Sequence, residues 1–309
     1  MPMKIEAIYV SSYRQDVQLT RLCVASIRFW YPHIPIWLVK DEKYGRFNTR
    51  DIERGWNVKV YAAVRKHFGW GMGKLEILLQ STRSRCLLLD SDIVFAGKVL
   101  DELECYDEDF VVVSENYGTG RIEHHFFSLK KLKELDPGFR FPGYGFNTGQ
   151  VVATSGVLCR SDFDPFVDWQ ASQVRHPDVF KRGEQGLLNY IVQRKMNEGS
   201  LTLRRVSFMV WPGEAANTEH IQVKDFTTEG RHRQLIHWAG LRWGKTLEQM
   251  PRSDILLHFE ELYYNRVPLG AWLRRWRRVK ARLDGAFVKP LKRAAKRLLK
   301  GKKPTPTAG

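Results

Sequence analysis

The first hundred residues alternate between short apolar runs and longer amphipathic segments. Short apolar runs bounded by polar residues predict buried strands, and apolar residues spaced three and four apart predict helices. The pattern predicts strands over residues 5–10, 34–39, 58–61 and 86–89, and helices over residues 17–30 and 74–80. Strands that alternate with helices in this way are typical of an α/β fold with a parallel sheet and crossover helices.

The same pattern continues less regularly in the following part of the chain. It predicts strands over residues 109–114, 150–153 and 235–238, a helix over 184–192, and a helix near 165–172. The last of these would start at Asp162-Phe163-Asp164, with an aspartate as cap and Pro165 in the first turn. The compact pattern stops after about Leu262, so we expect one domain over residues 1–262 and a separate segment over 263–309.

The composition fits a globular chain of 309 residues, 43% of them hydrophobic, which is enough to bury a full core. No apolar run approaches 18 residues, and the N-terminus leads directly into a strand-like segment, so we expect neither a membrane span nor a secretory signal. The four cysteines are scattered and form no Cys-x-x-Cys pair. They predict buried free thiols in a reducing, cytoplasmic compartment.

The net charge of +16 is concentrated at the C-terminal end. Residues 270–309 contain 14 lysines and arginines and the single acid Asp284, which leaves a net charge of only +3 for residues 1–269. The main domain is therefore nearly neutral, and the basic character of the protein belongs to its last forty residues.

This basic segment is also amphipathic. One face of a predicted helix over residues 270–288 carries Trp272, Trp276, Val279, Leu283 and Phe287, and arginines occupy much of the rest. A second basic helix is predicted over residues 291–300. Aromatic and basic amphipathic helices bind anionic membranes, so we expect residues 270–303 to hold the protein at the inner face of the cell membrane. A solvated basic extension is the alternative, and the one-sided tryptophans disfavour a nucleic-acid partner.

The feature with the most chemical content is an apolar strand that ends in acid. Leu87-Leu88-Leu89 leads directly into Asp90-Ser91-Asp92. Two carboxylates spaced i, i+2 can face one cation, whereas unpaired carboxylates beside a core are costly to bury. Two other Asp-x-Asp patterns lack this context, since Asp107 lies in an acidic loop and Asp162 lies at a helix start. Asp90 and Asp92 are thus the predicted metal ligands.

Other candidate residues are expected near this strand end. Ligands of open α/β sheets collect outside the carboxyl ends of the strands, which places Tyr9 and Ser11 on the same rim as Asp90. His237 is either an ordinary core histidine or a third metal ligand, because imidazole suits Mn²⁺-class ions. Beyond it, a turn with glycines and cations could approach a phosphate or could be an ordinary basic turn; its residues are Gly240, Arg242, Gly244 and Lys245.

Two further segments have a functional and a structural interpretation. Asn147 and Gly149 offer an amide side chain and a close approach of the backbone to a ligand, or simply a tight turn before a strand. Glu184 and Gln185 begin a helix, where a glutamate commonly complements the helix dipole, although one of the two could face a cleft.

In order along the chain, four segments resemble retaining GT-A glycosyltransferases, most nearly glycosyltransferase family 8 with its bacterial lipopolysaccharide-galactosyltransferase and glycogenin-like members. Residues 88–94 are similar to the family's Leu-Asp-x-Asp metal strand, and 146–149 to its Phe-Asn-Ser-Gly. Residues 184–189 stand where the family has Asp-Gln-Asp, and 237–240 match its His-x-x-Gly. The resemblance covers about residues 5–245 and implies a single Rossmann-like domain with a mixed central sheet.

The resemblance also implies roles. Asp90, Asp92 and His237 would hold Mn²⁺ or Mg²⁺ on the diphosphate of a nucleotide sugar, most simply a UDP-sugar. Asn147 and Glu184 would contact the transferred sugar, and Gln185 would lie under its anomeric carbon. The residues expected to bind the rest of the donor are Tyr9, Ser11, Lys74, Ser91, Gly240, Arg242 and Lys245.

Three departures from the family pattern matter. The family's last motif continues Gly-x-x-Lys-Pro-Trp, but here Leu241-Arg242-Trp243-Gly244-Lys245 follows Gly240, so the phosphate-binding cation is either Arg242 or Lys245. The first strand lacks the family's frequent acids, which leaves base recognition open. Glu184 replaces an aspartate and is one methylene longer.

We therefore expect a metal-dependent hexosyltransferase that acts, with retention, on a lipid-linked or lipopolysaccharide-type glycan. A sugar-nucleotide nucleotidyltransferase is one alternative, but Ser11-Ser12-Tyr13-Arg14 lacks the glycine-rich loop that such chemistry favours. A non-catalytic basic protein that binds membranes or nucleic acid is another, and the retained Asp90, Asp92 and His237 disfavour it.

Overall fold

A computed structural model describes residues 3–69, 71–227, 229–242 and 245–283. The chain divides into two compact units, residues 1–259 and residues 260–309. Phe287 and the predicted basic helix over 291–300 lie outside the described residues.

Most of the strands belong to one central sheet. The strands are β1 (Ala7–Tyr13), β2 (Ile36–Asp41), β3 (Lys59–Val60), β4 (Arg85–Asp90), β5 (Ile93–Phe95), β6 (Phe110–Val113), β7 (Gln150–Thr154), β8 (Val167–Asp168), β9 (Gln173–Val174), β10 (Leu203–Val206), β11 (Met209–Val210) and β12 (Leu235–His237). Seven of them form a sheet in the order β10-β6-β7-β4-β1-β2-β3. β1 pairs in parallel with β2 and β4, whereas β7 is antiparallel to β4 and β6. This confirms the expected α/β fold with a mixed sheet.

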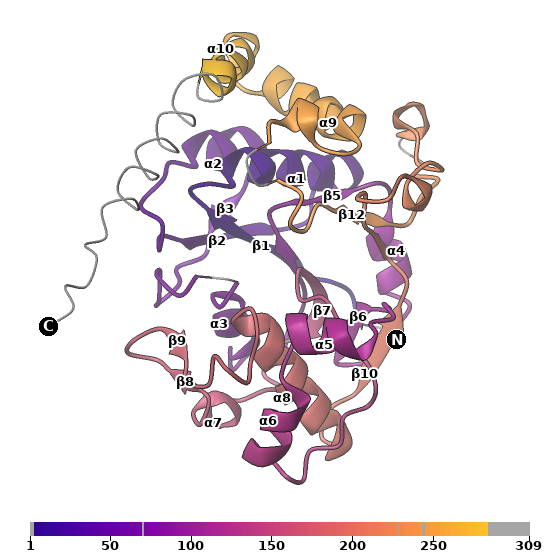
Figure 1. Cartoon of the computed structure of the whole chain (residues 1–309). Coiled ribbons are helices and arrows are strands. Elements are labelled where there is room, and N and C mark those ends of the chain that lie inside the picture. Colours follow the sequence, from indigo (N-terminus) through magenta and orange to yellow (C-terminus); the bar gives the residue numbers. More distant parts are fainter. Residues whose placement is uncertain (1–2, 70, 228, 243–244, 284–309) are drawn as a thin grey trace, which may run out of the picture. The chain divides into compact units, whose positions relative to one another are not determined.

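Helices cover both faces of the sheet. The helices are α1 (Val17–Trp30), α2 (Arg50–Trp56), α3 (Lys74–Leu78), α4 (Val99–Leu103), α5 (Thr119–His125), α6 (Leu129–Leu135), α7 (Arg160–Phe163), α8 (Glu184–Asn197), α9 (Ser253–Arg266) and α10 (Gly270–Leu283), with short 3₁₀ turns at Ala215–Asn217, Val223–Asp225 and Leu247–Gln249. Figure 1 shows α1 and α2 on one side of the sheet and α3, α5 and α8 on the other.

The alternation of side chains along β4 determines the direction in which its last side chain, that of Asp90, points. Cys86 and Leu88 belong to the apolar core that includes α3 and α8. Successive side chains of a strand point to opposite faces, so Asp90, two residues after Leu88, projects toward the same side as that core. The strand therefore places its terminal carboxylate beside α3 and α8.

A second, smaller sheet joins two distant segments of the chain. β12 is antiparallel to β5 and parallel to β11, and His237 pairs with Ile93. The amide of Trp238 donates to the carbonyl oxygen of Asp92 over 2.9 Å. This pairing fixes His237 directly beside the acidic end of β4.

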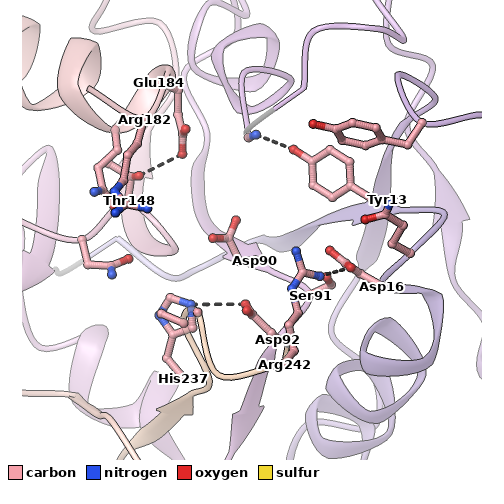
Figure 2. A pocket seen from close by; sticks show the side chains of 17 residues that line it. Tyr13, Asp16, Asp90, Ser91, Asp92, Thr148, Arg182, Glu184, His237 and Arg242 are labelled. Atoms are coloured by element: carbon pink, nitrogen blue, oxygen red, sulfur yellow. Dashed lines mark hydrogen bonds and ion pairs between the residues drawn. The ribbon is translucent and has the colours of Figure 1, made fainter. Parts of the chain in front are cut away.

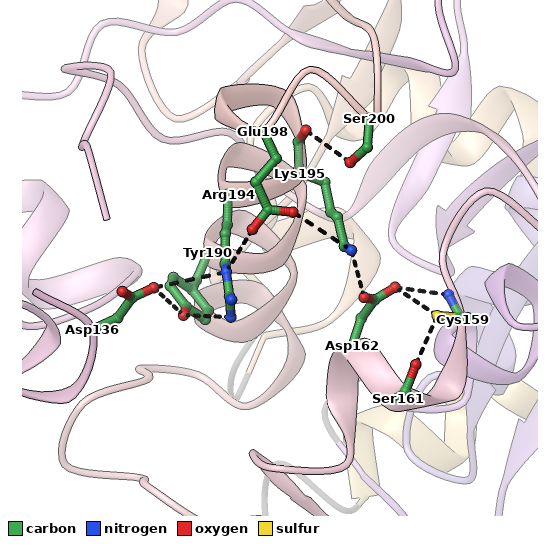
Figure 3. Close-up of polar contacts among 9 residues, drawn as sticks. All are labelled: Asp136, Cys159, Ser161, Asp162, Tyr190, Arg194, Lys195, Glu198 and Ser200. Carbon is green, nitrogen blue, oxygen red and sulfur yellow. Dashed lines mark hydrogen bonds and ion pairs between the residues drawn. The ribbon is translucent and has the colours of Figure 1, made fainter. Parts of the chain in front are cut away.

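The predicted helix near 165–172 is wrong. The helix there is α7, which ends at Phe163, because Cys159 and Asp162 form a capping box that starts it earlier. Asp162 accepts from the Cys159 amide at 2.9 Å and pairs with Lys195 at 2.7 Å (Figure 3). After Pro165 the chain forms the β8–β9 hairpin instead, with Ser172 at a positive φ of 52° in its turn.

The cysteines follow the sequence prediction only in part. All four are free thiols, but only Cys23 and Cys86 are buried, whereas Cys105 and Cys159 are exposed. Cys159 is the N-cap residue of α7. Among the described residues, no helix combines the length and the apolar character needed to cross a membrane.

In the second unit, α10 has two different faces. Glu260 is fully buried and pairs with Arg274 and Arg278 at 3.2 and 3.0 Å, and also with Arg277. Trp272 and Trp276 are 58% and 53% exposed. The described part of this helix thus turns arginines toward an internal acid and leaves aromatic rings uncovered.

Candidate functional site

A cavity of about 240 Å³ opens beside the acidic end of β4. Figure 2 shows Asp90 near its centre, with Glu184, Thr148 and Arg182 on one side and Tyr13, Asp16 and Arg242 on the other. The residues that line it are Tyr13, Gln15, Asp16, Tyr44, Gly71, Asp90, Ser91, Asp92, Asn147, Thr148, Arg182, Glu184, Gln185, His237, Ala239, Gly240 and Arg242.

Asp90, Asp92 and His237 meet in this cavity. One ligand atom from each lies within 4.8 Å of the other two, and the Nε2 atom of His237 is 3.2 Å from an oxygen of Asp92. Neighbouring ligands of an octahedral ion at about 2.1 Å lie about 3 Å apart, so this spacing suits a divalent cation. In the described part of the chain, no other three such side chains come equally close.

Gly149 makes this approach possible. A Cβ atom at this position would lie 2.4 Å from the ring of His237, 2.8 Å from the Asn147 side-chain oxygen and 3.0 Å from Asp90 Oδ2. The Asn147 oxygen also accepts the Gly149 amide at 2.7 Å. Because any side chain would displace these groups, the glycine predicted for close backbone approach has a geometric reason.

Charge interactions tie Asp92 to His237. Burial alone would lower the pKa of His237, but the facing carboxylate of Asp92 outweighs it and raises that pKa. Burial alone would likewise raise the pKa of Asp92, and the imidazole outweighs it and lowers that pKa. The two groups therefore favour a charged pair, which a divalent cation would replace with ligand bonds.

Lys74 holds Asp90 from behind. It is buried, and its Nζ atom donates to Asp90 Oδ1 at 2.6 Å and to the carbonyl oxygen of Thr148 at 2.7 Å. Burial alone would lower its pKa, but Asp90 and Glu184 outweigh it and raise that pKa. Lys74 does not line the cavity, so its geometry is that of a positioning residue rather than a direct ligand contact.

Glu184 is a buried acid at the start of α8. Its Oε1 atom accepts the Thr148 hydroxyl at 2.8 Å and lies 3.8 Å from the Nζ atom of Lys74. Burial raises the pKa of Glu184 to about 7, although Lys74 opposes this shift. A Cβ atom on Gly71 would lie 2.6 Å from the same oxygen, so the carboxylate is packed closely on that side as well.

The two predicted amide side chains also face the cavity. Asn147 lines it through the turn that precedes β7, and Gln185 lines it from the first turn of α8. The Gln185 side chain donates to the carbonyl oxygen of His125 at 3.0 Å, which fixes its orientation. The structure thus brings Asn147, Glu184 and Gln185 together beside the candidate metal ligands.

The other predicted donor contacts divide into two groups. Ser91, Gly240 and Arg242 line the cavity, whereas Tyr9, Ser11 and Lys245 do not.

The residues outside the cavity have other surroundings. Tyr9 lies four residues before the end of β1, and its ring stacks on that of Trp37 with 6.4 Å between the centroids. Ser11 is buried, and Lys245 is exposed. Of the two cations considered for a phosphate, Arg242 is the one that reaches the cavity.

Several lining residues were not predicted. Tyr13 lies at the end of β1, three residues beyond the predicted strand, and its hydroxyl accepts the Gly71 amide. Asp16 forms an ion pair with Arg242. Arg182 precedes α8 at a φ of +52°. Of these residues, only Tyr13 could have been suggested by the sequence, because alternate residues of a strand share a face and Tyr13 continues the series of Tyr9 and Ser11.

Comparison with known proteins locates the fold. No family model matches the sequence, and no curated protein matches it. Solved structures of glycosyltransferases, among them WbbM, LgtC and GlyE, are similar over most of this chain. The bifunctional glycosyltransferase WbbM is 13% identical over 89% of the chain, with a TM-score of 0.57. The galactosyltransferase LgtC, solved with donor and acceptor sugar analogues, is 14% identical over 87%, with a TM-score of 0.55.

The glycosyltransferase GlyE of Streptococcus pneumoniae TIGR4 is 15% identical over 90% of the chain, with a TM-score of 0.51. The chain spans 99% of LgtC but only 52% of WbbM and 64% of GlyE. At these identities the likeness concerns the fold. The chain has the GT-A fold found in glycosyltransferases.

Proposed function

We propose that the protein is a metal-dependent glycosyltransferase that moves a hexose from a UDP-sugar to a saccharide acceptor. The observation that carries this proposal is the meeting of Asp90, Asp92 and His237 in one cavity with Asn147, Glu184 and Gln185. A GT-A fold with a candidate cation-binding set beside two half-buried amides and a buried carboxyl group is suited to breaking a bond between a sugar and a diphosphate.

The proposed ligand set suits Mn²⁺ or Mg²⁺. Asp90 and Asp92 would supply oxygen ligands and His237 a nitrogen ligand, a combination that fits Mn²⁺-class ions. When bound, the ion supplies positive charge that stabilises the departing diphosphate. Lys74 keeps one oxygen of Asp90 occupied, so the other oxygen, beside Gly149, is the one oriented toward the cation.

The proposed reaction is a substitution at the anomeric carbon. The bond from that carbon to the diphosphate oxygen breaks, and its electron pair leaves with UDP. The acceptor hydroxyl oxygen forms the new bond, and one proton is released. Asn147 and Glu184 would orient the sugar, and Gln185 would lie beside the carbon as positive charge develops.

Retention of configuration and the donor contacts are also part of the proposal. Retention rests on the resemblance of residues 184–189 to family 8. Arg242 is favoured over Lys245 as the phosphate-binding cation, because Arg242 lines the cavity. Ser91 and Gly240 would contact the donor from the same side.

We extend the proposal to the membrane. The uncovered rings of Trp272 and Trp276, with the exposed cations Arg275 and Lys280, support binding of an anionic membrane surface. A lipid-linked or lipopolysaccharide-type acceptor at the inner face of the cell membrane would then be within reach of the enzyme.

Metal-dependent binding and hydrolysis of UDP-sugars tests the proposal. Wild-type protein should bind UDP at least tenfold more tightly with Mn²⁺ than with EDTA, and should release UDP from a UDP-hexose. Asp92→Asn should lose this metal dependence, whereas Asp107→Asn, which changes the exposed first acid of another Asp-x-Asp pattern, should retain it. If wild-type protein binds UDP equally with and without metal, or not at all, the proposed function is wrong.

A further inference from the structure

The mouth of the cavity carries a group of cationic and imidazole side chains that the proposed transfer reaction does not use. Arg182 lines the cavity and is exposed, and one of its guanidinium nitrogens lies 3.1 Å from the Nε2 atom of His124. Arg121 and His125 complete the group. Because Arg121, His124 and His125 are spaced i, i+3 and i+4, they share one face of α5.

This group has a defined geometry beside the proposed catalytic groups. The carbonyl oxygen of Phe126 accepts the Lys181 amide at 2.7 Å, and the carbonyl oxygen of His125 accepts the Gln185 side chain. A Cβ atom on Gly186 would lie 2.0 Å from the Phe126 oxygen. The end of α5 and the start of α8 are therefore packed backbone to backbone, which sets the distance from His124 to Arg182.

The backbone at Arg182 is unusual. Its φ of +52° lies in the left-handed region, and Gly183 follows at a φ of +62°. A non-glycine residue in this region costs on the order of 1 kcal/mol, and such strain concentrates where a side chain has a function.

The cations of this group form no close ion pairs with acids. In the described ranges, neither Arg121 nor Arg182 has a carboxylate within 4.0 Å, and the Arg121 charge acts on Glu115 only at a longer distance. The nearby acids have other partners: Glu184 accepts from Thr148, Glu115 from Tyr117 and Glu123 from the Leu129 amide. Burial, together with Arg182, His124 and Arg121, lowers the pKa of His125, which agrees with an excess of positive charge.

We propose that Arg182, held by His124, recognises an anionic group on the acceptor saccharide. An arginine is always protonated, so His124 accepts this hydrogen bond and orients the planar guanidinium, which binds a phosphate or carboxylate through two parallel hydrogen bonds. Arg182 lies on the side of the cavity away from Tyr13 and Arg242 (Figure 2), and it is exposed where Glu184 is buried. This position suits a partner that enters from solvent.

The inference rests on the proposed function and has a binding test of its own. Ligand-observed NMR titrations would compare glucose, glucose 6-phosphate and glucuronate on full-length protein loaded with UDP and Mg²⁺, since Mn²⁺ would broaden the signals. We expect one or both anionic sugars to bind at least tenfold more tightly than glucose. A preference for glucose 6-phosphate alone identifies a phosphate, and a preference for glucuronate alone identifies a carboxylate.

Variants test whether the preference for anionic sugars over glucose depends on Arg182 and His124. Arg182→Gln should reduce the preference to less than threefold, Arg182→Lys should retain part of it, and His124→Ala should weaken it. Arg54→Gln, which removes an exposed arginine of α2 outside the cavity lining, should leave it unchanged. Unchanged thermal unfolding would show that these exposed positions do not affect folding.

Equal binding of all three sugars to wild-type protein, or an unchanged preference in Arg182→Gln, would overturn the inference. These results are separable from failure of the proposed function. If UDP binds with metal but no anion preference exists, only the inference fails. If UDP does not bind and the free protein still shows an Arg182-dependent preference, the anion site stands and the proposed transfer reaction does not.

Discussion

The ammonium group of Lys74 lies 2.6 Å from Asp90 Oδ1, inside the protein and behind the cavity. The same group lies 3.8 Å from Glu184, so one buried cation serves two acids from β4 and α8. Removing one member of a buried charged network leaves the other charges unpaired. This costs more folding free energy than replacing the whole network with apolar side chains. The network therefore couples the stability of the fold to the orientation of a candidate metal ligand.

Lys74→Met should decrease the free energy of unfolding by about 3 kcal/mol, because Asp90 and Glu184 would then face each other without a cation. Urea denaturation measures this. The double variant Lys74→Met/Glu184→Gln should recover part of the loss at pH 8, where the Glu184 carboxyl is ionised in wild type and a glutamine is neutral. Lys131→Met, which breaks an exposed pair with Asp178 at 2.7 Å, should cause no measurable change. Equal effects at Lys74 and Lys131 would contradict the buried network.

Gly149→Ala should weaken metal-dependent UDP binding at least tenfold. The added methyl would lie 2.4 Å from the His237 ring, so the imidazole or the turn must move. Calorimetric titration of UDP with Mn²⁺ gives the affinity. Gly138→Ala is the control, because its nearest neighbour would be an Asp136 oxygen at an ordinary 3.5 Å. Unchanged affinity in Gly149→Ala would mean that this close approach is not needed.

The raised pKa of Glu184 predicts a pH-dependent effect on stability. With a pKa of about 7 in the folded protein against an ordinary 4.5, the folded state binds a proton between these values that the unfolded state does not. Its contribution is therefore fully present below pH 4.5 and is lost as the pH rises through 7, on the order of 3 kcal/mol in total. Lys74, Asp90 and Thr148 are the groups that face it.

Glu184→Gln should remove this dependence, so the variant should gain stability relative to wild type from pH 5 to pH 8. Urea denaturation at several pH values measures the difference. Glu198→Gln, at an exposed acid that pairs with Arg194 at 3.0 Å (Figure 3), should show a constant difference from wild type. A constant difference for Glu184→Gln would mean that Glu184 is ionised throughout this range.

The exposed rings of α10 predict membrane binding that depends on them. The double variant Trp272→Ser/Trp276→Ser should bind vesicles of equal phosphatidylcholine and phosphatidylglycerol at least fivefold more weakly than wild type. Vesicle sedimentation measures this. Val64→Ser, at another exposed apolar position, should bind normally. If the double variant sediments with vesicles as wild type does, these rings are not the contact.

The sequence predicted the central elements because their signals are local. The apolar run before Asp90 specifies a buried strand, and the carboxylates at its end mark the candidate cation site. The helix near 165–172 could not be predicted correctly, because the capping box at Cys159 and Asp162 competes with the Asp-Pro signal that follows. Such competition is decided by packing, including the pair from Asp162 to Lys195.

The unpredicted cavity residues depend on contacts between distant segments. Arg182 faces the cavity because Gly186 packs against the Phe126 carbonyl oxygen, and a sequence pattern does not encode that approach. The apolar pattern predicts Tyr9 at the rim because the apolar run ends at residue 10, whereas β1 continues to Tyr13. An error of three residues at a strand end is enough to exchange one tyrosine for another at the site.

The pairing of β12 with β5 affects the order in which the protein folds and forms its candidate cation site. During synthesis, Asp90 and Asp92 leave the ribosome long before His237, so a nascent chain has carboxylates but no complete cation site. Closing a contact between such distant segments is slow, because the intervening chain must first be ordered. Cation binding would thus come at the end of folding, and a bound ion should slow unfolding by holding the last strand to the strand that follows Asp92.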